Sequence, residues 1–352
     1  MRIDALPVFF HPRQLDHKPL YEWAFGERIA HPETTHRAEG ILAALSADPI
    51  FSIRPPGEVP MQRLGELHDP RLATLYQTAA SLPASATFYP SVFPKRDQAA
   101  PNPLDINQAG FFCFDAGTPL AATTWDAAAW SAACAHEAGL AVAGGAPLAY
   151  ALCRPPGHHA QRDLFGGYCY FNNAAIVAAR IAAEGKRAAI VDIDFHHGNG
   201  TQAIFYSDPR VLVISIHGDP RDFYPYFAGY AEETGAGEGV GYNLNIPLRA
   251  GADGQAYLRV LESVVLGRLR LFDPATIVLS AGLDAYKDDP LGRFALETAD
   301  FAAIGDRLGR LGVPIVAVQE GGYCTEKLGD NAVALLRGLR DGLAGETRIA
   351  VP

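Results

Sequence analysis

The chain is predicted to form one α/β domain with a central, mainly parallel sheet and helices on both faces. Short apolar runs of strand length alternate with longer amphipathic segments from residue 148 to residue 318. Strands that alternate with helices in this way form parallel sheets. Hydrophobic residues make up 49% of the 352 residues, so a large core can be buried. We therefore expect a single domain over residues 1–352.

The expected elements follow from the spacing of the apolar residues. Amphipathic segments predict helices at 36–47, 65–81, 124–144, 174–184, 256–272 and 299–311. Apolar runs predict strands at 148–153, 188–195, 211–217, 242–246, 276–281 and 315–318, with a further short apolar run at 5–10. Residues 82–124 differ, because they are rich in proline and lack a periodic pattern. A loop this long within a compact domain is usually functional, so we expect an excursion that covers a site or forms a subunit contact.

Composition limits the classes of function. The formal net charge of −10 disfavours nucleic acid as the main partner. The five cysteines are odd in number and scattered, as is typical of reduced thiols in a cytoplasmic protein. No apolar run reaches the roughly 18 residues of a membrane helix. We expect a cytoplasmic protein without a membrane segment.

Polar residues gather in four segments that each follow a predicted strand. The segments are 154–159 (RPPGHH), 192–200 (DIDFHHGNG), 280–284 (SAGLD) and 320–323 (EGGY). Parallel strands of one sheet bring such segments to the same edge, where α/β proteins bind their ligands. In an extended chain Asp192, Asp194 and His196 would share one face. A lone Asp284 after a strand is more often a cap or turn residue, a His-His pair is often on the surface, and the Asp-x-Asp-x-His segment has near even odds. The prediction of a site therefore depends on their occurring together.

The residue types indicate metal-assisted hydrolysis of an amide or ester. Asp194, His196 and Asp284 offer two carboxylates and one imidazole, which suit Zn²⁺ and do not exclude Fe²⁺ or Co²⁺. A metal lowers the pKa of a bound water from 15.7 to about 7. The paired histidines His158 and His159 can move protons, and the hydroxyl of Tyr323 can stabilise an oxyanion.

The motifs resemble the histone deacetylase superfamily. The resemblance rests on RPPGHH at 154–159, GGYC at 166–169, DIDFHHGNGTQ at 192–202 and GGY at 321–323. The tract 217–235 and the long excursion resemble the bacterial acetylpolyamine amidohydrolases within it. The resemblance implies an arginase-like fold with a parallel sheet of eight strands and one Zn²⁺ per subunit. It also implies removal of acetyl groups from N-acetylated polyamines or diamines, with release of acetate and free amine.

By this resemblance, Asp194, His196 and Asp284 bind the metal that activates a water, and Tyr323 polarises the carbonyl. Asp192 would partner His158, and Asn199 would partner His159. An amide stabilises an imidazolium less than a carboxylate does, so we expect His159 to be the general base. The substrate channel would be formed by Gly167, Tyr168, Tyr224 and Leu291. Two structural potassium ions would be bound by Asp192, Asp194, His196, Ser215 and Ile216 and by Phe205, Asp208, Val211 and Tyr242.

The resemblance also implies a homodimer that takes a small acetylated amine. The excursion would contact a second subunit, with Phe111, Phe112 and Trp125 available for packing. The distal ammonium should meet a carboxylate. The sequence after Asp105 departs from the family pattern, which leaves two alternatives open: Asp105 takes this role, or no carboxylate lies there. Two alternatives remain, a deacetylase of acetyl-lysine in proteins or peptides and a non-catalytic module that binds acetyl-lysine. Hydrolysis of acetylputrescine against that of an acetyl-lysine peptide would distinguish the three.

Overall fold

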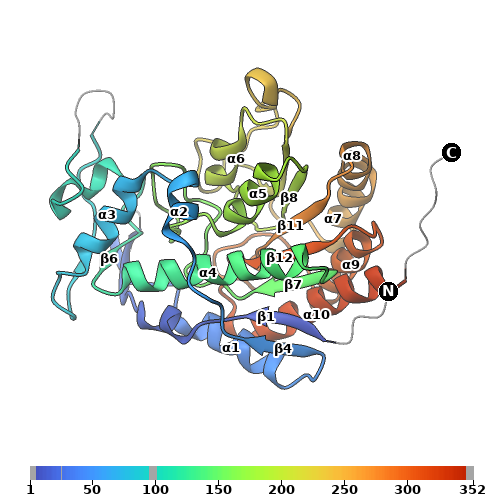
Figure 1. The fold of residues 1–352 in the computed structure, drawn as a ribbon, viewed down its shortest axis with the longest axis horizontal. Helices are drawn as coiled ribbons and strands as arrows, with labels where there is room; N and C mark the ends of the chain where they lie inside the picture. The colour runs from blue at the N-terminus through green and yellow to red at the C-terminus, as the bar shows by residue number, and fades with distance from the viewer. Residues whose placement is uncertain (1–4, 25, 95–100, 346–352) are drawn as a thin grey trace.

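The computed structural model describes residues 5–24, 26–94 and 101–345. Eight of its strands form one sheet, namely β1 (Leu6–Phe9), β4 (Phe51–Arg54), β7 (Leu148–Ala151), β8 (Ala188–Asp192), β9 (Val211–Gly218), β10 (Asn243–Leu248), β11 (Thr276–Ala281) and β12 (Ile315–Gln319). Their order across the sheet is β10-β9-β8-β11-β12-β7-β1-β4, and each neighbouring pair is parallel (Figure 1). This arrangement confirms the predicted fold class.

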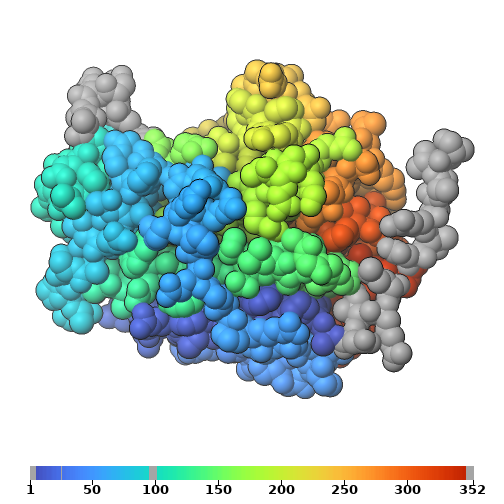
Figure 2. Space-filling model, viewed as in Figure 1, coloured from blue at the N-terminus to red at the C-terminus, as the bar shows by residue number. Residues whose placement is uncertain are grey.

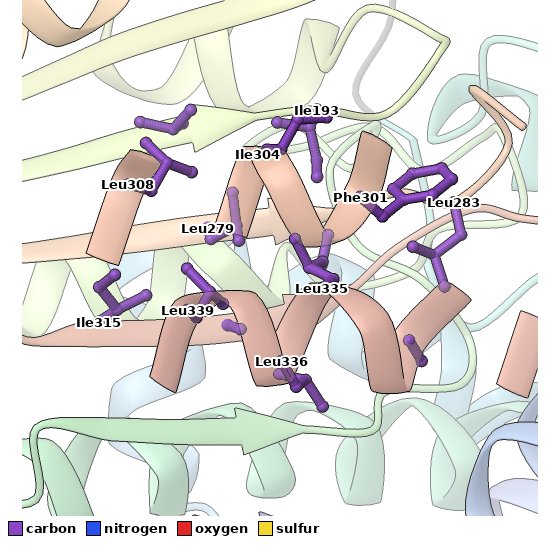
Figure 3. Close-up of a cluster of buried hydrophobic side chains, with 14 of the residues drawn as sticks. Ile193, Leu279, Leu283, Phe301, Ile304, Leu308, Ile315, Leu335, Leu336 and Leu339 are labelled. Carbon is purple, nitrogen blue, oxygen red and sulfur yellow. The ribbon is translucent and has the colours of Figure 1, made fainter. Parts of the chain in front are cut away.

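Helices cover both faces of the sheet, because successive strand residues alternate between two cores. In β8, Ala189 and Val191 belong to one core and Ala188 and Ile190 to the other. The first core contains side chains of α1 (Thr35–Ser46), α7 (Gly254–Val260), α8 (Leu266–Phe272), α9 (Thr298–Gly309) and α10 (Thr325–Ala344). The second contains side chains of α2 (Met61–Leu67), α3 (Pro70–Ala79), α4 (Thr124–Ala143) and α5 (Asn173–Ala183). Figure 3 shows Leu335 and Leu339 of α10 on the side of that helix that faces α9, with the strands of the sheet behind both helices.

Two expected helices differ from the structure, and one long helix was not expected. The helix expected at 65–81 is two helices, because Pro70 begins α3 and Asp69 before it is extended and caps the new helix. The helix expected at 256–272 contains a π-helical turn, Leu261–Val265, between α7 and α8. Helix α10 was not predicted, although its buried positions Leu328, Leu335 and Leu339 have helical spacing. None of the described helices has the length and apolar composition needed to cross a membrane.

The excursion is packed onto the domain and has short elements of its own. Strand β5 (Thr87–Phe88) pairs antiparallel with β6 (Leu120–Ala121), and Ile106–Phe111 form a 3₁₀ helix; its residues 95–100 lie outside the described residues. Phe112 is buried in the second core of its own chain, so the expectation that it packs against a partner is wrong. Phe111 and Trp125 also pack on that core. In Figure 2 the described part of the excursion, in cyan, gathers at one end of the molecule.

A two-stranded hairpin lies outside the main sheet. Its strands are β2 (Tyr21–Ala24) and β3 (Glu27–Ala30). Glu22 of this hairpin is buried, whereas its neighbour Trp23 is 46% exposed. The hairpin therefore presents one acidic side chain to the interior of the protein.

Candidate active site

The four polar segments follow four adjacent strands. Strands β8, β11, β12 and β7 are neighbours in this order, and the four segments begin at or just after their carboxyl ends. Strands β9 and β10 continue the sheet in one direction from β8, while β11 and β12 continue it in the other. The site therefore lies where the strand order changes direction, which is the usual ligand position in such sheets.

Asp194, His196 and Asp284 come together at this edge. One ligand atom from each lies within 4.8 Å of the other two. His196 Nδ1 is 2.9 Å from Asp284 Oδ2 and 3.4 Å from Asp194 Oδ1. Both carboxylates are fully buried, and His196 is slightly exposed. Two carboxylate oxygens and one imidazole nitrogen are a suitable donor set for a divalent metal with an open position.

The local backbone differs from the expected extended strand. Strand β8 ends at Asp192, so the argument from alternating side chains does not hold for Asp194 and His196. Instead, Asp192 Oδ1 accepts the backbone N–H of Asp194, and Asp194 Oδ1 accepts that of His196. These short-range bonds bend the chain. Asp192 Oδ2 is thereby left to bind His158, while Asp194 and His196 meet Asp284.

The electrostatics of the cluster favour a cation. Burial and the charge of Asp194 raise the pKa of Asp284 to about 8. Burial opposes the charged form of His196, but Asp194 and Asp284 raise its pKa to about 9. Two carboxylates this close repel one another unless positive charge lies between them. The residues present therefore fit a divalent metal ion, which would take the place of a proton shared by the cluster.

His158 and His159 differ in their partners. His158 Nδ1 donates to Asp192 Oδ2 at 2.9 Å, and His159 Nδ1 donates to Asn199 Oδ1 at 2.7 Å. Burial lowers the pKa of both rings, but Asp194 and Asp192 raise that of His158 to about 10. The pKa of His159 is well below its usual value because of burial and the nearby His158 and His196. These shifts favour the charged form of His158 and the neutral form of His159, in which Nε2 can accept a proton.

The loop before Tyr323 passes very close to the cluster. A Cβ on Gly321 would lie 2.6 Å from Asp194 Oδ2 and 2.7 Å from Asp284 Oδ2, so only glycine fits there. Gly321 N–H donates to Asp194 Oδ2 at 2.8 Å. The guanidinium of Arg37 stacks 4.7 Å from the centroid of the Tyr323 ring and donates to the carbonyl of Gly322. Burial raises the pKa of Tyr323 well above its usual value, so its hydroxyl keeps its proton and can donate.

The predicted channel residues surround these groups. The Tyr168 ring lies 6.1 Å from that of Tyr323, and the Tyr224 ring meets that of His159 edge-on at 5.0 Å. Gly167 has a φ of +57°, and a Cβ there would lie 2.2 Å from His159 Cδ2. The half-buried Leu291 donates its backbone N–H to Asp289. The two tyrosines thus flank the cluster and the histidine pair.

Two carboxylates beside these tyrosines were not predicted. The Tyr168 hydroxyl donates to Glu22 Oε2 at 2.8 Å, and the Tyr224 hydroxyl donates to Asp115 Oδ2 at 2.9 Å. Asp105, one of the two alternatives left open for this role, caps its own 3₁₀ helix and accepts hydrogen bonds from Asn107 and Gln108. Glu22 and Asp115 come from the hairpin and the excursion, and no local pattern marks either residue as part of a site.

The role of Glu320 was also missed. Its Oε2 accepts the backbone N–H groups of Gly157 and His158 at 2.7 and 3.0 Å. Burial raises its pKa to about 7. Glu320 therefore holds the loop that carries the histidine pair, from the segment that also carries Tyr323.

The residues predicted to bind potassium lie in two places. Asp192 and Ser215 are partners across β8 and β9, and Ile216 follows in β9. Phe205 ends helix α6 (Asn199–Phe205), and its carbonyl accepts from Asp208 N–H, while the Asp208 carbonyl accepts from Val211. The Tyr242 carbonyl accepts from Val213 N–H. Binding of potassium at these places stays a prediction.

This fold and site define a protein of the deacetylase class. The chain belongs to the family described as the histone deacetylase domain, whose model matches residues 31–339. Within that family it is similar to bacterial acetylpolyamine amidohydrolases. It is 41% identical to one from Burkholderia pseudomallei, over 94% of this chain and 98% of the relative, and 40% identical to acetylpolyamine amidohydrolase 2 of Pseudomonas aeruginosa, over 92% and 95%.

Solved structures give the same result. The crystal structure of acetylpolyamine aminohydrolase from Burkholderia pseudomallei superposes with a TM-score of 0.90 at 39% identity, covering 96% of this chain and 99% of that one. The HD domain of HDA15 superposes with a TM-score of 0.80 at 31% identity, covering 97% of this chain and 91% of that one. The predicted resemblance is therefore confirmed at the level of family, and the chain is related to enzymes throughout its domain.

Proposed function

We propose that this chain is a zinc-dependent amidohydrolase that removes acetyl groups from N-acetylated polyamines or diamines and releases acetate and the free amine. The observation that carries the choice of substrate is the pair of carboxylates, Glu22 and Asp115, bonded to the two tyrosines beside the metal cluster. The names of the similar bacterial enzymes support the same substrate class.

Asp194, His196 and Asp284 would hold Zn²⁺, and Fe²⁺ or Co²⁺ would also suit this set. A metal bound there supplies Lewis acidity, which polarises a carbonyl and lowers the pKa of a water from 15.7 to about 7. His159 accepts the proton of the attacking water at its free Nε2, and the cationic His158 stabilises the negative charge that develops. Tyr323 donates its hydroxyl proton in a hydrogen bond to the carbonyl oxygen.

The carboxylates would select a cationic substrate. An acetylated diamine has a neutral acetamide at one end and an ammonium at the other, and a buried ammonium requires a negative partner. Burial and the neighbouring Asp115 raise the pKa of Glu22, so an arriving ammonium would favour its charged form. Asp115 also accepts the backbone N–H groups of Gly117, Thr118 and Gly167 and is therefore rigid. The walls Tyr168 and Tyr224 would guide the methylene chain between the two ends.

We also propose that the protein is a homodimer in which the excursion contacts the second subunit. Val92, Phe93 and Leu104 of the excursion are 71%, 44% and 70% exposed, which is costly for apolar side chains on an isolated surface. Light scattering coupled to size exclusion would give twice the mass of the 37.7 kDa chain. A monomeric mass at micromolar concentration would contradict this proposal.

The proposed function is tested by measuring the hydrolysis of acetylputrescine, longer acetylated diamines and an acetyl-lysine peptide by zinc-loaded protein. We expect the small amines to be hydrolysed with the higher kcat/KM. Faster turnover of the peptide would indicate a protein deacetylase. Binding of either compound without any hydrolysis would indicate an acetyl-lysine-binding module.

A further inference from the structure

Asp289 is a buried carboxylate that accepts four backbone N–H groups. It follows β11 by a few residues and is 5% exposed. Its Oδ1 accepts from Leu291 at 2.9 Å and from Gly292 at 3.2 Å. Its Oδ2 accepts from Tyr323 at 2.6 Å and from Cys324 at 3.0 Å. Both oxygens are therefore fully used by main-chain donors.

The four amides belong to two segments that are distant in sequence. Gly292 packs against the backbone of Asp284, since a Cβ on Gly292 would lie 1.7 Å from the Asp284 carbonyl oxygen. Tyr323 and Cys324 lie in the loop after β12. The Asp289 carboxylate thus links the backbone of Tyr323 by hydrogen bonds to the loop after β11, which also contains the predicted metal ligand Asp284. On the other side, Arg37 donates to the carbonyl of Gly322, so the C=O and the N–H of the Gly322–Tyr323 peptide group are held by two buried charged side chains, Arg37 and Asp289.

We propose that Asp289 is a positioning residue that sets the place of the Tyr323 hydroxyl relative to the metal cluster. This inference rests on the proposed function. Hydrogen bonds to a buried charge are about twice as strong as neutral ones, and four of them define the position of a loop closely. A displacement of about 1 Å at a catalytic group can cost 10²-fold in rate. Such a displacement affects the developing oxyanion more than the bound substrate, so it lowers kcat and leaves KM nearly unchanged.

The test compares Asp289→Asn with Asp288→Asn, a change at the exposed neighbouring position. The side-chain amide introduced by Asp289→Asn can accept at its oxygen only, so two N–H groups lose their acceptor. We expect kcat per folded, metal-loaded site to fall roughly 10- to 100-fold with KM changed less than about twofold. Asp288→Asn should behave as the unaltered protein. Loss of bound zinc in Asp289→Asn, measured by elemental analysis, would instead mean that Asp289 acts through Asp284 and would overturn the proposal.

A double-mutant cycle identifies the residue through which Asp289 acts. In a Tyr323→Phe background there is no hydroxyl to misplace, so Asp289→Asn should lower kcat by less than about twofold further. Additive effects of the two changes would overturn the proposal. If Asp289→Asn does not fold, the cycle is run with Asp289→Glu, which keeps the charge but moves the acceptors by one methylene. Absence of hydrolysis by the unaltered protein would contradict the proposed function, whereas full activity of Asp289→Asn in an active enzyme would contradict only this inference.

Discussion

The cluster of Asp194, His196 and Asp284 and the tyrosine–carboxylate pairs are both acidic, but they are built differently. The cluster is formed by segments that follow adjacent strands of one sheet, and its carboxylates are fully buried. The pairs Tyr168–Glu22 and Tyr224–Asp115 join long segments after β7 and β9 to a hairpin and an excursion, and both tyrosines are half-buried. The sheet thus fixes the groups proposed for the chemistry, and the added segments supply those proposed for substrate choice. Changes in the cluster should therefore affect all acetylated substrates, and changes at the pairs only cationic ones.

The largest effect is expected for Asp284→Asn. An amide is a poor metal ligand, so we expect loss of the metal and a fall in kcat of roughly 10³-fold, since a metal supplies several kcal/mol and about 1.4 kcal/mol is tenfold. The loss should be equal for acetylputrescine and for a neutral N-acetylalkylamine. Elemental analysis measures the metal content, and steady-state kinetics measure kcat for each substrate. Retention of metal and activity would show that Asp284 is not a ligand.

His159→Ala should have the next largest effect. Removal of a general base costs about 10²- to 10⁴-fold in rate, and the loss should again be independent of substrate charge. The matched variant is His158→Ala, which removes the cationic partner and should cost less. The assignment of the base is wrong if His159→Ala keeps most of its kcat while His158→Ala loses it.

Glu22→Gln should affect only the substrates with an ammonium group. We expect KM for acetylputrescine to rise about tenfold or more, since a hydrogen bond to a charged group is worth about 1.5–3 kcal/mol and about 1.4 kcal/mol is tenfold. The neutral N-acetylalkylamine should be unaffected. Glu27→Gln, an exposed change in the same hairpin, is the control. An equal rise in KM for both substrates would mean that Glu22 supports the hairpin and does not bind the ammonium.

The sequence predicted the sheet and the groups along its edge better than the parts built from loops. Apolar strands that alternate with helices can be recognised from the sequence itself. Neighbouring parallel strands bring their carboxyl ends to one edge of the sheet, so the convergence of His158, Asp194 and Asp284 could be expected. Helix α10 was also predictable, because its buried leucines have helical spacing. The roles of Glu22 and Asp115 could not be predicted, because they depend on how a hairpin and an excursion fold onto the sheet. Asp105 was the only candidate that the sequence offered for the distal ammonium, and its side chain caps its own 3₁₀ helix.

The role of Asp289 could not be predicted for the same reason, because it too depends on how distant segments pack together. Its neighbour Asp288 has the same chemistry and is exposed, and nothing in the sequence distinguishes the two. Only the packing of the loop after β12 against the loop after β11 brings four N–H groups to one of them. Residues that act through the backbone of another segment leave no local pattern, in contrast to the proposed metal ligands and the histidine pair.

The smallest effect is expected for Asn199→Asp, which tests the difference between the two histidines. A carboxylate 2.7 Å from His159 Nδ1 would stabilise the imidazolium and raise the pKa of His159, which burial and the charges of His158 and His196 now hold low. A base with a higher pKa is protonated at higher pH, so the acidic limb of the kcat/KM profile should move to higher pH by about one unit or more. Activity well above that limb should change little. Asn199 contacts His159 and not the tyrosine–carboxylate pairs, so the acidic limb should move equally for acetylputrescine and for the neutral N-acetylalkylamine. An unmoved limb would mean that His159 does not set it and that another group accepts the proton.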